Sequence, residues 1–316
     1  MAAQPLSDDV LQEALQAKAA HPNNDSAAAR SLGVNRLTFV HRLREASRRG
    51  VASNFNPDAA WTWPREKRLD MHSGVVVVYS DAHYWPGEAS TAHQGLLAVI
   101  RKLKPRVVIA NGDVFDGSSV GRHPPFGWAS RPGPVDELHA CQERQGEVEL
   151  AVPRGCQLLW NIGNHCLRFE RTLAMQAKEF AGLHGLRLAD HFPAWEFQWS
   201  TLVNPDERDP VMIKHRHAGG VHAGYNNAMK GGLSIVTGHT HNLEVKPWGD
   251  YRGRRYGVQT GTLADLHGPQ FEYHENGPSP SCSGFAVLTF KDGKLLPPEL
   301  CEVIDGQAYF RGEVMA

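Results

Sequence analysis

Four short motifs in the sequence carry carboxylate, imidazole and amide side chains of the kinds that bind divalent metal ions. In chain order they are Asp81-Ala-His83, Asn111-Gly-Asp113-Val-Phe-Asp116, Gly163-Asn164-His165 and Gly238-His239-Thr-His241. Carboxylate oxygens, imidazole nitrogens and amide oxygens are the ligands that borderline and hard divalent cations accept in proteins. The motifs therefore indicate a metal centre built from segments that lie far apart in the chain.

Each motif follows a short apolar run that is typical of a buried β-strand. The runs that precede the four motifs are 75–80, 106–110, 157–162 and 234–237. Because loops at strand ends are held by a rigid sheet, motifs placed there can converge on one point. Helical patterns alternate with these runs, and a Lys-Asp-Gly-Lys turn joins two further strands over 285–290 and 295–303. The order of elements predicts an α/β domain with some antiparallel sheet.

This ordered set of motifs resembles that of the calcineurin-like metallophosphoesterases, whose pattern is DxH, GDxxD, GNH and GHxH. Chance alone gives about one His-x-His pair in a chain with 17 histidines, so the last motif by itself is weak. Four motifs in this order are far more specific, and they cover residues 74 to about 265. The resemblance implies an α/β (α+β) fold, a four-layer double β-sheet sandwich flanked by helices, with two divalent metals at one end.

The resemblance also implies which residues hold the metals. They are Asp81, His83 and His241 for the first metal, Asp113 as the bridge, and Asn164 and His239 for the second. The family has one more histidine ligand between GNH and GHxH, and His215 fits best because it ends the apolar run 211–215. His217 and His222 stay open as alternatives. Mn²⁺ is the first expectation for both ions, with Fe, Zn²⁺ or Mg²⁺ as alternatives.

His165 is implied to act beside the metals rather than as a ligand. By resemblance it lies near the leaving group as a general acid or a phosphate contact, and Asp116 orients it. The alternative for Asp116 is a helix cap or a loop residue. Two positions depart from the family pattern: Gly117 stands where the protein-phosphatase branch has arginine, and Cys166 where many members have Asp or Glu. The missing arginine argues against a Ser/Thr protein phosphatase.

A different pattern precedes these motifs. Three helices are predicted over 8–20, 26–32 and 36–48, and the last two, joined by Leu-Gly-Val, look like a helix-turn-helix. Between Arg30 and Arg49 there are six arginines and one glutamate. The side chains that could face a DNA groove and its phosphates are Arg36, Thr38, His41, Arg42 and Arg48. A helical hairpin with a solvated basic face is the alternative.

These patterns divide the chain into three parts. We expect a helix-turn-helix over 1–50, a linker over 51–73 and a calcineurin-like phosphoesterase domain over 74–316. A loop rich in Pro and Gly, 118–134, follows the second motif. Its Arg122 and His123 could contact a substrate phosphate, and a structural lid is the alternative.

Composition excludes several classes of protein. Lys plus Arg is 33 and Asp plus Glu is 34, for a net charge of −1, so the 316-residue chain is not a polybasic coat for nucleic acid. The apolar runs are far shorter than the roughly 18 residues needed to cross a bilayer, and the N-terminus shows no signal peptide. Five cysteines without a CxxC pair favour a reducing compartment. We therefore expect a cytoplasmic protein with no membrane partner.

The combination of elements looks like that of proteins of phage or prophage origin. The leading hypothesis is a metal-dependent phosphodiesterase or nuclease, in which the metals activate a water for attack on phosphorus. DNA is the expected partner, because a tethered DNA-binding module raises the effective concentration of substrate. One alternative is a phosphomonoesterase or cyclic-nucleotide phosphodiesterase whose N-terminal helices assist oligomerisation. The other is a DNA-binding regulator with an inactive phosphoesterase shell.

Overall fold

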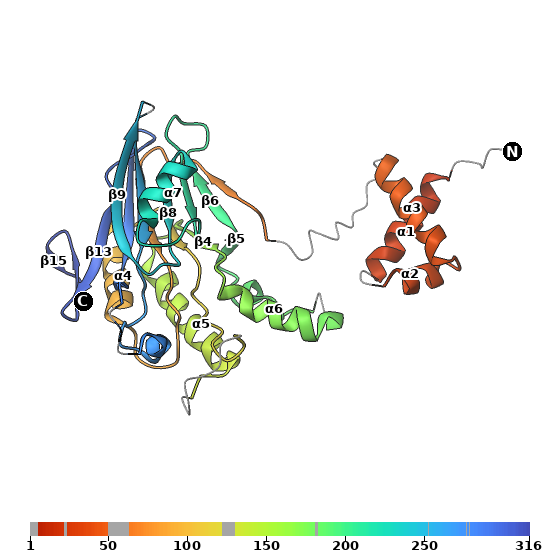
Figure 1. Cartoon of the computed structure of the whole chain (residues 1–316), viewed down its shortest axis with the longest axis horizontal. Helices are drawn as coiled ribbons and strands as arrows, with labels where there is room; N and C mark the ends of the chain where they lie inside the picture. Colours follow the sequence, from red (N-terminus) through yellow and green to blue (C-terminus); the bar gives the residue numbers. More distant parts are fainter. Residues whose placement is uncertain are drawn as a thin grey trace. The chain divides into compact units, whose positions relative to one another are not determined.

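The computed structural model describes residues 6–21, 24–49, 63–121, 130–180, 183–251, 253–275, 277 and 279–316, without the side chains at 47, 48, 178 and 273. The chain divides into two compact units, Met1–Trp63 and Pro64–Ala316 (Figure 1). In the described ranges, the first unit consists of helices and the second contains two β-sheets with their helices.

The first unit is built from α1 (Asp8–Ala20), α2 (Asp25–Ser31) and α3 (Arg36–Arg49). Its core consists mostly of alanines, which let the helices approach closely, around the fully buried ring of Phe39. The side chains of Asn24 and Asn35 each accept a hydrogen bond from a backbone amide in the first turn of α2 and α3. Gly33, with φ 64°, makes the turn between these two helices. The predicted N-terminal all-helical segment is confirmed.

The larger sheet of the second unit has the strand order β15-β14-β13-β11-β2-β3-β4-β5, with β12 paired to β11. Its parallel strands are β2 (Gly74–Tyr79), β3 (Val107–Ala110), β4 (Gln157–Asn161) and β5 (Glu196–Gln198). Its antiparallel strands are β11 (Gly284–Lys291), β12 (Lys294–Leu295), β13 (Glu299–Ile304), β14 (Gln307–Phe310) and β15 (Glu313–Val314). The expected hairpin near the C-terminus is the pairing of β11 with β12 and β13.

The smaller sheet has the strand order β1-β6-β7-β8-β10-β9. Its strands are β1 (Lys67–Leu69), β6 (Ser200–Val203), β7 (Val211–Lys214), β8 (Ser234–Thr237), β9 (Leu243–Asp250) and β10 (Gly253–Thr260). Strand β1 lies within the segment 51–73, which we expected to be a linker, and it pairs in parallel with β6. The second unit therefore begins at Pro64 rather than at residue 74. The pattern gave no sign of β1, because Lys-Arg-Leu is not an apolar run.

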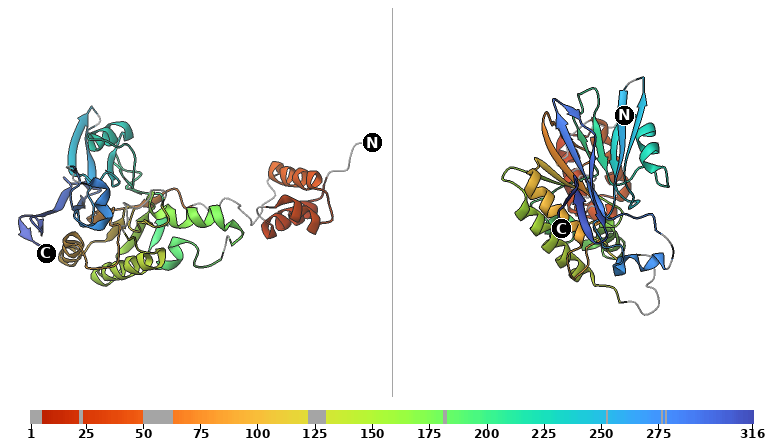
Figure 2. Two further views of the ribbon diagram at one scale, coloured as in Figure 1. Left: turned by 60° about the horizontal axis from the view of Figure 1, so that its bottom comes forward. Right: turned by 90° about the vertical axis from the view of Figure 1, so that its left-hand side faces the viewer.

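The two sheets pack face to face and share one core. Val78 and Ile109 of the larger sheet belong to the same buried cluster as Ile213, Val236 and Val258 of the smaller one. Helices cover the outer faces (Figure 1, Figure 2): α4 (Thr91–Leu103) packs on the larger sheet with α5 (Pro134–Ala151) beside it, and α7 (Ala223–Gly231) packs on the smaller sheet. The remaining elements are α6 (Cys166–Gln176) and the 3₁₀ helices η1 (Lys178–Phe180), η2 (Leu188–His191) and η3 (Pro269–His274). The expected double-sheet α/β sandwich is confirmed.

The topology brings the four motifs to one place. Strands β2, β3 and β4 run parallel, so the motifs that follow them emerge at one edge of the larger sheet. Strands β7 and β8 are also parallel, and His215 and the fourth motif follow them. No helix in the described ranges combines the length and the apolar character needed to span a bilayer.

Candidate metal centre

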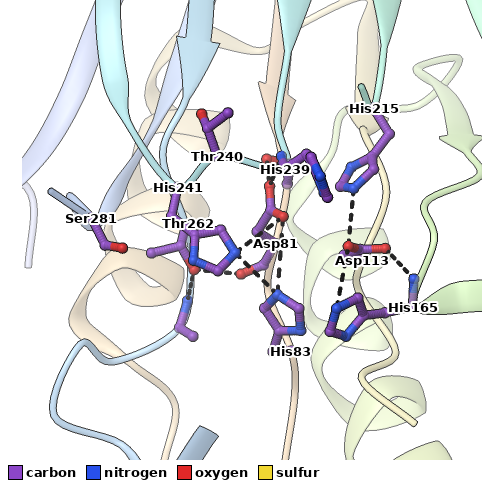
Figure 3. A network of polar contacts seen from close by, with 12 residues as sticks. Asp81, His83, Asp113, His165, His215, His239, Thr240, His241, Thr262 and Ser281 are labelled. Carbon is purple, nitrogen blue, oxygen red and sulfur yellow. Dashed lines mark hydrogen bonds and ion pairs between the residues drawn. The ribbon is translucent and has the colours of Figure 1, made fainter. Parts of the chain in front are cut away.

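The first cluster of candidate ligands joins Asp81 and His83, which follow β2, to His241, which follows β8 (Figure 3). Nε2 of His241 lies 3.3 Å from Oδ1 of Asp81 and 3.4 Å from Nε2 of His83. Nε2 of His83 lies 4.0 Å from Oδ1 of Asp81. Ligands bound at about 2.1 Å to one tetrahedral ion are themselves about 3.4 Å apart. The three atoms therefore have a spacing that suits a single metal ion.

The second cluster joins Asp113, His215 and His239, which follow β3, β7 and β8. Nε2 of His215 lies 2.9 Å from Oδ2 of Asp113, and both residues are buried, whereas His239 is exposed. Asp113 also forms a third group with His83 and His165, so it lies between the two clusters. This is where a carboxylate must lie to bridge two cations.

Three buried polar atoms among the described residues of this site make no hydrogen bond, although two of them lie at ion-pair distance from another side chain. They are Oδ1 of Asp81, Oδ1 of Asn164 and Nε2 of His215. Buried polar atoms in native proteins are almost always paired, so each unpaired one needs an explanation. All three belong to residues expected from the sequence to bind metal, and bound ions would satisfy them together. The donor set of carboxylates, imidazoles and one amide oxygen fits a pair of divalent ions.

The backbone at the site is strained in a way that serves close packing of the ligands. Positive φ values occur at Asp81 (52°), His83 (42°), Asp113 (51°), His239 (71°) and His241 (58°). Residues other than glycine rarely adopt this left-handed region, and those that do gather at functional sites. Neighbouring glycines allow the approach: a Cβ on Gly238 would lie 2.5 Å from Oδ2 of Asp81, and one on Gly163 2.1 Å from Oδ1 of Asp113.

Two of the histidines are oriented through their Nδ1 atoms. Nδ1 of His215 donates to the carbonyl oxygen of Asn111 at 2.8 Å, and Nδ1 of His83 lies 3.1 Å from Oδ1 of Asp116. Such contacts fix the ring and leave Nε2 directed at a metal. Asp116 thus supports a candidate ligand, a role that the sequence did not indicate.

Opposite charges lie close together in the site and shift each other's pKa values. Burial opposes ionisation of Asp81, but the nearby imidazoles of His215 and His241 outweigh it and lower the pKa of Asp81 to about 2. Burial likewise opposes protonation of His215, but Asp113 and Asp81 raise its pKa to about 9. With this raised pKa, a metal ion bound at Nε2 of His215 would compete with a proton for that atom.

His165 lies beside Asp113 and forms the third group with it and His83. Its Nδ1 is 2.7 Å from Oδ1 of Asp116, and Nη2 of Arg168 donates to its Nε2 at 2.9 Å. Arginine only donates, so Nε2 is an acceptor and Nδ1 carries the hydrogen that Asp116 receives. Burial is the main cause of a lowered pKa for His165, in agreement with a neutral ring. The structure thus provides the contact through which Asp116 was expected to orient His165.

Sequence reasoning missed two side chains here. Trp85 donates its ring N–H to Oδ2 of Asp116 at 2.9 Å, and Arg168 contacts both Asp116 and His165. The signal for Arg168 was present, because a residue three positions after His165 on a helix lies next to it. Trp85 follows the first motif in an irregular segment whose path no periodicity predicts.

Several other expected residues lie elsewhere. His217 and His222 are exposed, and neither belongs to any of the three metal-binding groups in the described part of the chain. His215 is therefore the histidine of the three that the structure brings to the site. Arg122 and His123 lie outside the described residues. Cys166 is a buried thiol at the start of α6, and burial raises its pKa to about 11, so it stays neutral as a core residue.

The residues expected to face DNA lie on α3. Arg36, Thr38 and His41 are exposed, and Arg42 is half-buried. The side chain of Arg48 lies outside the described residues. A neighbouring arginine is engaged within its own unit: Arg49 pairs with Glu45 at 2.6 Å and also donates to a backbone carbonyl near the N-terminus.

Comparison with known proteins finds relatives in phages. No family model matches the sequence. The Gene 54 protein of Mycobacterium phage L5 is 32% identical over 111 residues, and the Gene 54 protein of Mycobacterium phage D29 is 32% identical over 112 residues. Each match covers 32% of this chain and 42% of the relative, so the chain spans less than half the length of these relatives. The similarity agrees with the phage or prophage character noted from the sequence.

Solved structures with a similar arrangement are distant in sequence. The crystal structure of wild-type Vps29 complexed with Zn²⁺ from Entamoeba histolytica is 14% identical, covers 77% of this chain and 99% of its own, and has a TM-score of 0.41. The crystal structure of a dimetal phosphatase from Danio rerio is 9% identical, covers 77% and 98%, and has a TM-score of 0.35. Function is therefore inferred from the residues of the site.

Proposed function

We propose that this protein is a phosphoesterase that uses two divalent metal ions, as its resemblance to the calcineurin-like metallophosphoesterases implies. The observation that carries the proposal is the pair of adjoining His/Asp clusters, in which buried atoms of Asp81 and His215 make no hydrogen bond. The buried Oδ1 of Asn164, in the third motif, makes none either. When bound, two such ions neutralise an anionic ester and lower the pKa of a shared water. An inactive regulator with a phosphoesterase shell would not need this complete set of donors.

The two ions would divide the ligands between them. We assign Asp81, His83 and His241 to the first ion, Asn164, His215 and His239 to the second, and Asp113 to both. The set mixes nitrogen and oxygen donors, which suits Mn²⁺, Fe and Zn²⁺ better than it suits Mg²⁺. Mn²⁺ remains our first expectation.

His165 would serve the leaving group. Its ring is held through Nδ1 by Asp116, and Nε2, which accepts a hydrogen bond from Arg168 in the structure, is the atom that must take up a proton before His165 can donate to a departing oxygen. A protonated ring would gain from the carboxylate of Asp116, because an opposite charge in contact stabilises an imidazolium. The side chain is 23% exposed, so an ester bound at the metals can reach it.

DNA is the substrate that the first unit supports. The exposed residues Arg36, Thr38 and His41 follow the turn of a helix-turn-helix pattern, where the second helix reads a groove in DNA-binding proteins. Arg30 and Arg44 add exposed positive charge on the same unit. The one acidic residue of α3, Glu45, pairs with Arg49 and so offsets one of the positive charges of this unit. We therefore propose a phosphodiesterase or nuclease that acts on DNA.

A substrate screen with the full chain tests both levels of the proposal. Protein stripped with EDTA and reloaded with Mn²⁺ is assayed on p-nitrophenyl phosphate, bis-p-nitrophenyl phosphate, a cyclic nucleotide, and single- and double-stranded DNA. We expect metal-dependent hydrolysis of the diester and of DNA. Activity on the monoester or the cyclic nucleotide alone would show that the protein is a phosphoesterase whose substrate is not DNA. No activity on any ester at full metal loading would contradict the proposal that the protein is a phosphoesterase.

A further inference from the structure

Arg168 is a cationic side chain that touches the candidate site without being one of its ligands. It lies on α6, the helix that begins directly after Asn164 and His165. Its Nη1 donates to the carbonyl oxygen of Asp116 at 3.0 Å, and its Nη2 donates to Nε2 of His165 at 2.9 Å. The side chain is 22% exposed, so the guanidinium lies at the rim of the centre and remains open to solvent.

Two glycines make room for this guanidinium. A Cβ on Gly117 would lie 2.9 Å from Cβ and 3.3 Å from Cδ of Arg168, and one on Gly121 would lie 3.4 Å from its Nη1. One turn further along α6, the hydroxyl of Thr172 donates to the carbonyl oxygen of Val120 at 3.3 Å. The helix and the loop after Asp116 therefore fix the side chain in one position.

The contacts of Arg168 leave binding capacity unused. A guanidinium has five N–H donors and keeps its charge at any physiological pH. Among the described residues its hydrogen-bond partners are one carbonyl oxygen and one neutral ring nitrogen, and Oδ1 of Asp116 lies further away, at 3.6 Å. That carboxylate oxygen already faces Nδ1 of both His83 and His165. Asp116 therefore compensates the charge of Arg168 only in part, because its Oδ1 also contacts two histidines. N–H donors of Arg168 remain for an anion.

We propose that Arg168 binds a non-bridging oxygen of the scissile phosphate and holds the substrate against His165. The inference rests on the proposed phosphoesterase function, and it names a substrate contact on the leaving-group side of the metals. The planar fork of a guanidinium matches the oxygens of a phosphate, and such charge-assisted bonds are strong. Because Arg168 also donates to Nε2 of His165, a phosphate oxygen bound by its remaining donors would lie beside that ring.

The test compares Arg168→Ala and Arg168→Lys with Arg171→Ala in the full chain loaded with Mn²⁺. Arg171 is an exposed arginine on the same helix, so its variant removes the same charge away from the site. For Arg168→Ala we expect kcat/KM for bis-p-nitrophenyl phosphate to fall on the order of 10- to 100-fold, and inhibition by inorganic phosphate to weaken similarly. Arg168→Lys should lose less, and added guanidinium ion should restore part of the activity of Arg168→Ala. Arg171→Ala should match the wild type.

The outcomes separate this inference from the proposed function. If Arg168→Ala lowers the melting temperature but keeps the wild-type KM and phosphate inhibition, Arg168 only clamps the helix, and the inference is overturned. If the wild type with both ions bound hydrolyses no ester, the proposed function fails, and calorimetry with inorganic phosphate then decides on Arg168. Weaker phosphate binding by Arg168→Ala than by Arg171→Ala supports the contact, and equal binding overturns it.

Discussion

Nε2 of His215 lies 2.9 Å from Oδ2 of Asp113, yet it makes no hydrogen bond. The two residues follow strands of different sheets, β7 and β3, so the face-to-face packing of the sheets creates this contact. A Cβ on Gly112 would lie 2.4 Å from Nδ1 of His215, so the approach also depends on a glycine. The two atoms are close enough to be neighbouring ligands of one ion.

Replacing His215 should remove one metal ion. We expect His215→Ala to retain about one Mn²⁺ per chain after dialysis, where the wild type retains two, because the second ion loses a buried ligand. His217→Ala and His222→Ala are matched controls, since both side chains are exposed and lie outside the clusters. Elemental analysis of the dialysed proteins measures this. Two ions in His215→Ala, with a loss in either control, would show that the ligand was assigned to the wrong histidine.

Stability of the metal-free protein should fall at alkaline pH. The folded pKa of His215, about 9, lies above the ordinary value of 6.5, so its proton stabilises the fold fully below pH 6.5. That contribution, on the order of 3 kcal/mol, is lost as the pH rises through 9. Metal binding displaces the same proton, so the stabilisation by Mn²⁺ should grow over this pH range. Melting temperatures with Mn²⁺ and with EDTA between pH 6 and 9.5 check this, and a constant difference between them would contradict it.

The sequence was sufficient for the parts of the structure that strong apolar runs define. The expected strand over 75–80 is β2, Gly74–Tyr79, and the motifs after β2, β3, β4 and β8 could be placed at one end because a short buried run gives few other choices. His215 could be favoured over its neighbours by the same reasoning. Strand β1 could not be predicted, because only Leu69 of its Lys-Arg-Leu is buried and three residues show no apolar run.

The contacts around His165 depend on tertiary packing. Asp116 was expected to orient His165, but its contacts with His83 and Trp85 arise from the path of the loop after β2. Arg168 reaches the site because α6 packs against the glycines at 117 and 121. No spacing in the sequence reports such a contact between segments.

Neutralising Asp113 should abolish catalysis without unfolding the protein. We expect Asp113→Asn to lower turnover of bis-p-nitrophenyl phosphate at least on the order of 10²- to 10³-fold, because an amide cannot hold two cations as a carboxylate does. Circular dichroism should show the wild-type fold. Asp206→Asn, at an exposed aspartate of the same unit, is the control that should keep full turnover. Near-normal turnover by Asp113→Asn would contradict the assignment of Asp113 as the ligand of both metal ions.

The N-terminal unit should carry the affinity for DNA. Each phosphate contact contributes about −0.9 to the slope of log affinity against log salt, so about four arginine contacts predict a slope of roughly −4. A chain that starts at Pro64 should keep its turnover of small diesters, because every proposed metal ligand lies beyond residue 80, and should lose most of its advantage on DNA. Both activities are measured for the full and the shortened chain at low and moderate salt. Unchanged DNA binding and cleavage after truncation would contradict this prediction and favour a role of the helices in oligomerisation.

The arginines of α3 can be tested in the same DNA-binding assay. The double variant Arg36→Ala/Arg44→Ala should weaken DNA binding and reduce the salt slope by about 2, since each lost phosphate contact removes about 0.9. Arg101→Ala, at an exposed arginine of the second unit, is the matched control. Equal slopes for the double variant and the control would place the DNA contacts elsewhere.

The central claim, that two adjoining ions make this site a phosphoesterase, is tested most directly by titrating Mn²⁺ into the EDTA-stripped full chain. Bound metal and hydrolysis of bis-p-nitrophenyl phosphate are followed in the same samples. The donor set predicts that activity stays low with the first ion and reaches its plateau at two ions per chain. A plateau at one ion, or two bound ions without hydrolysis, would contradict the claim.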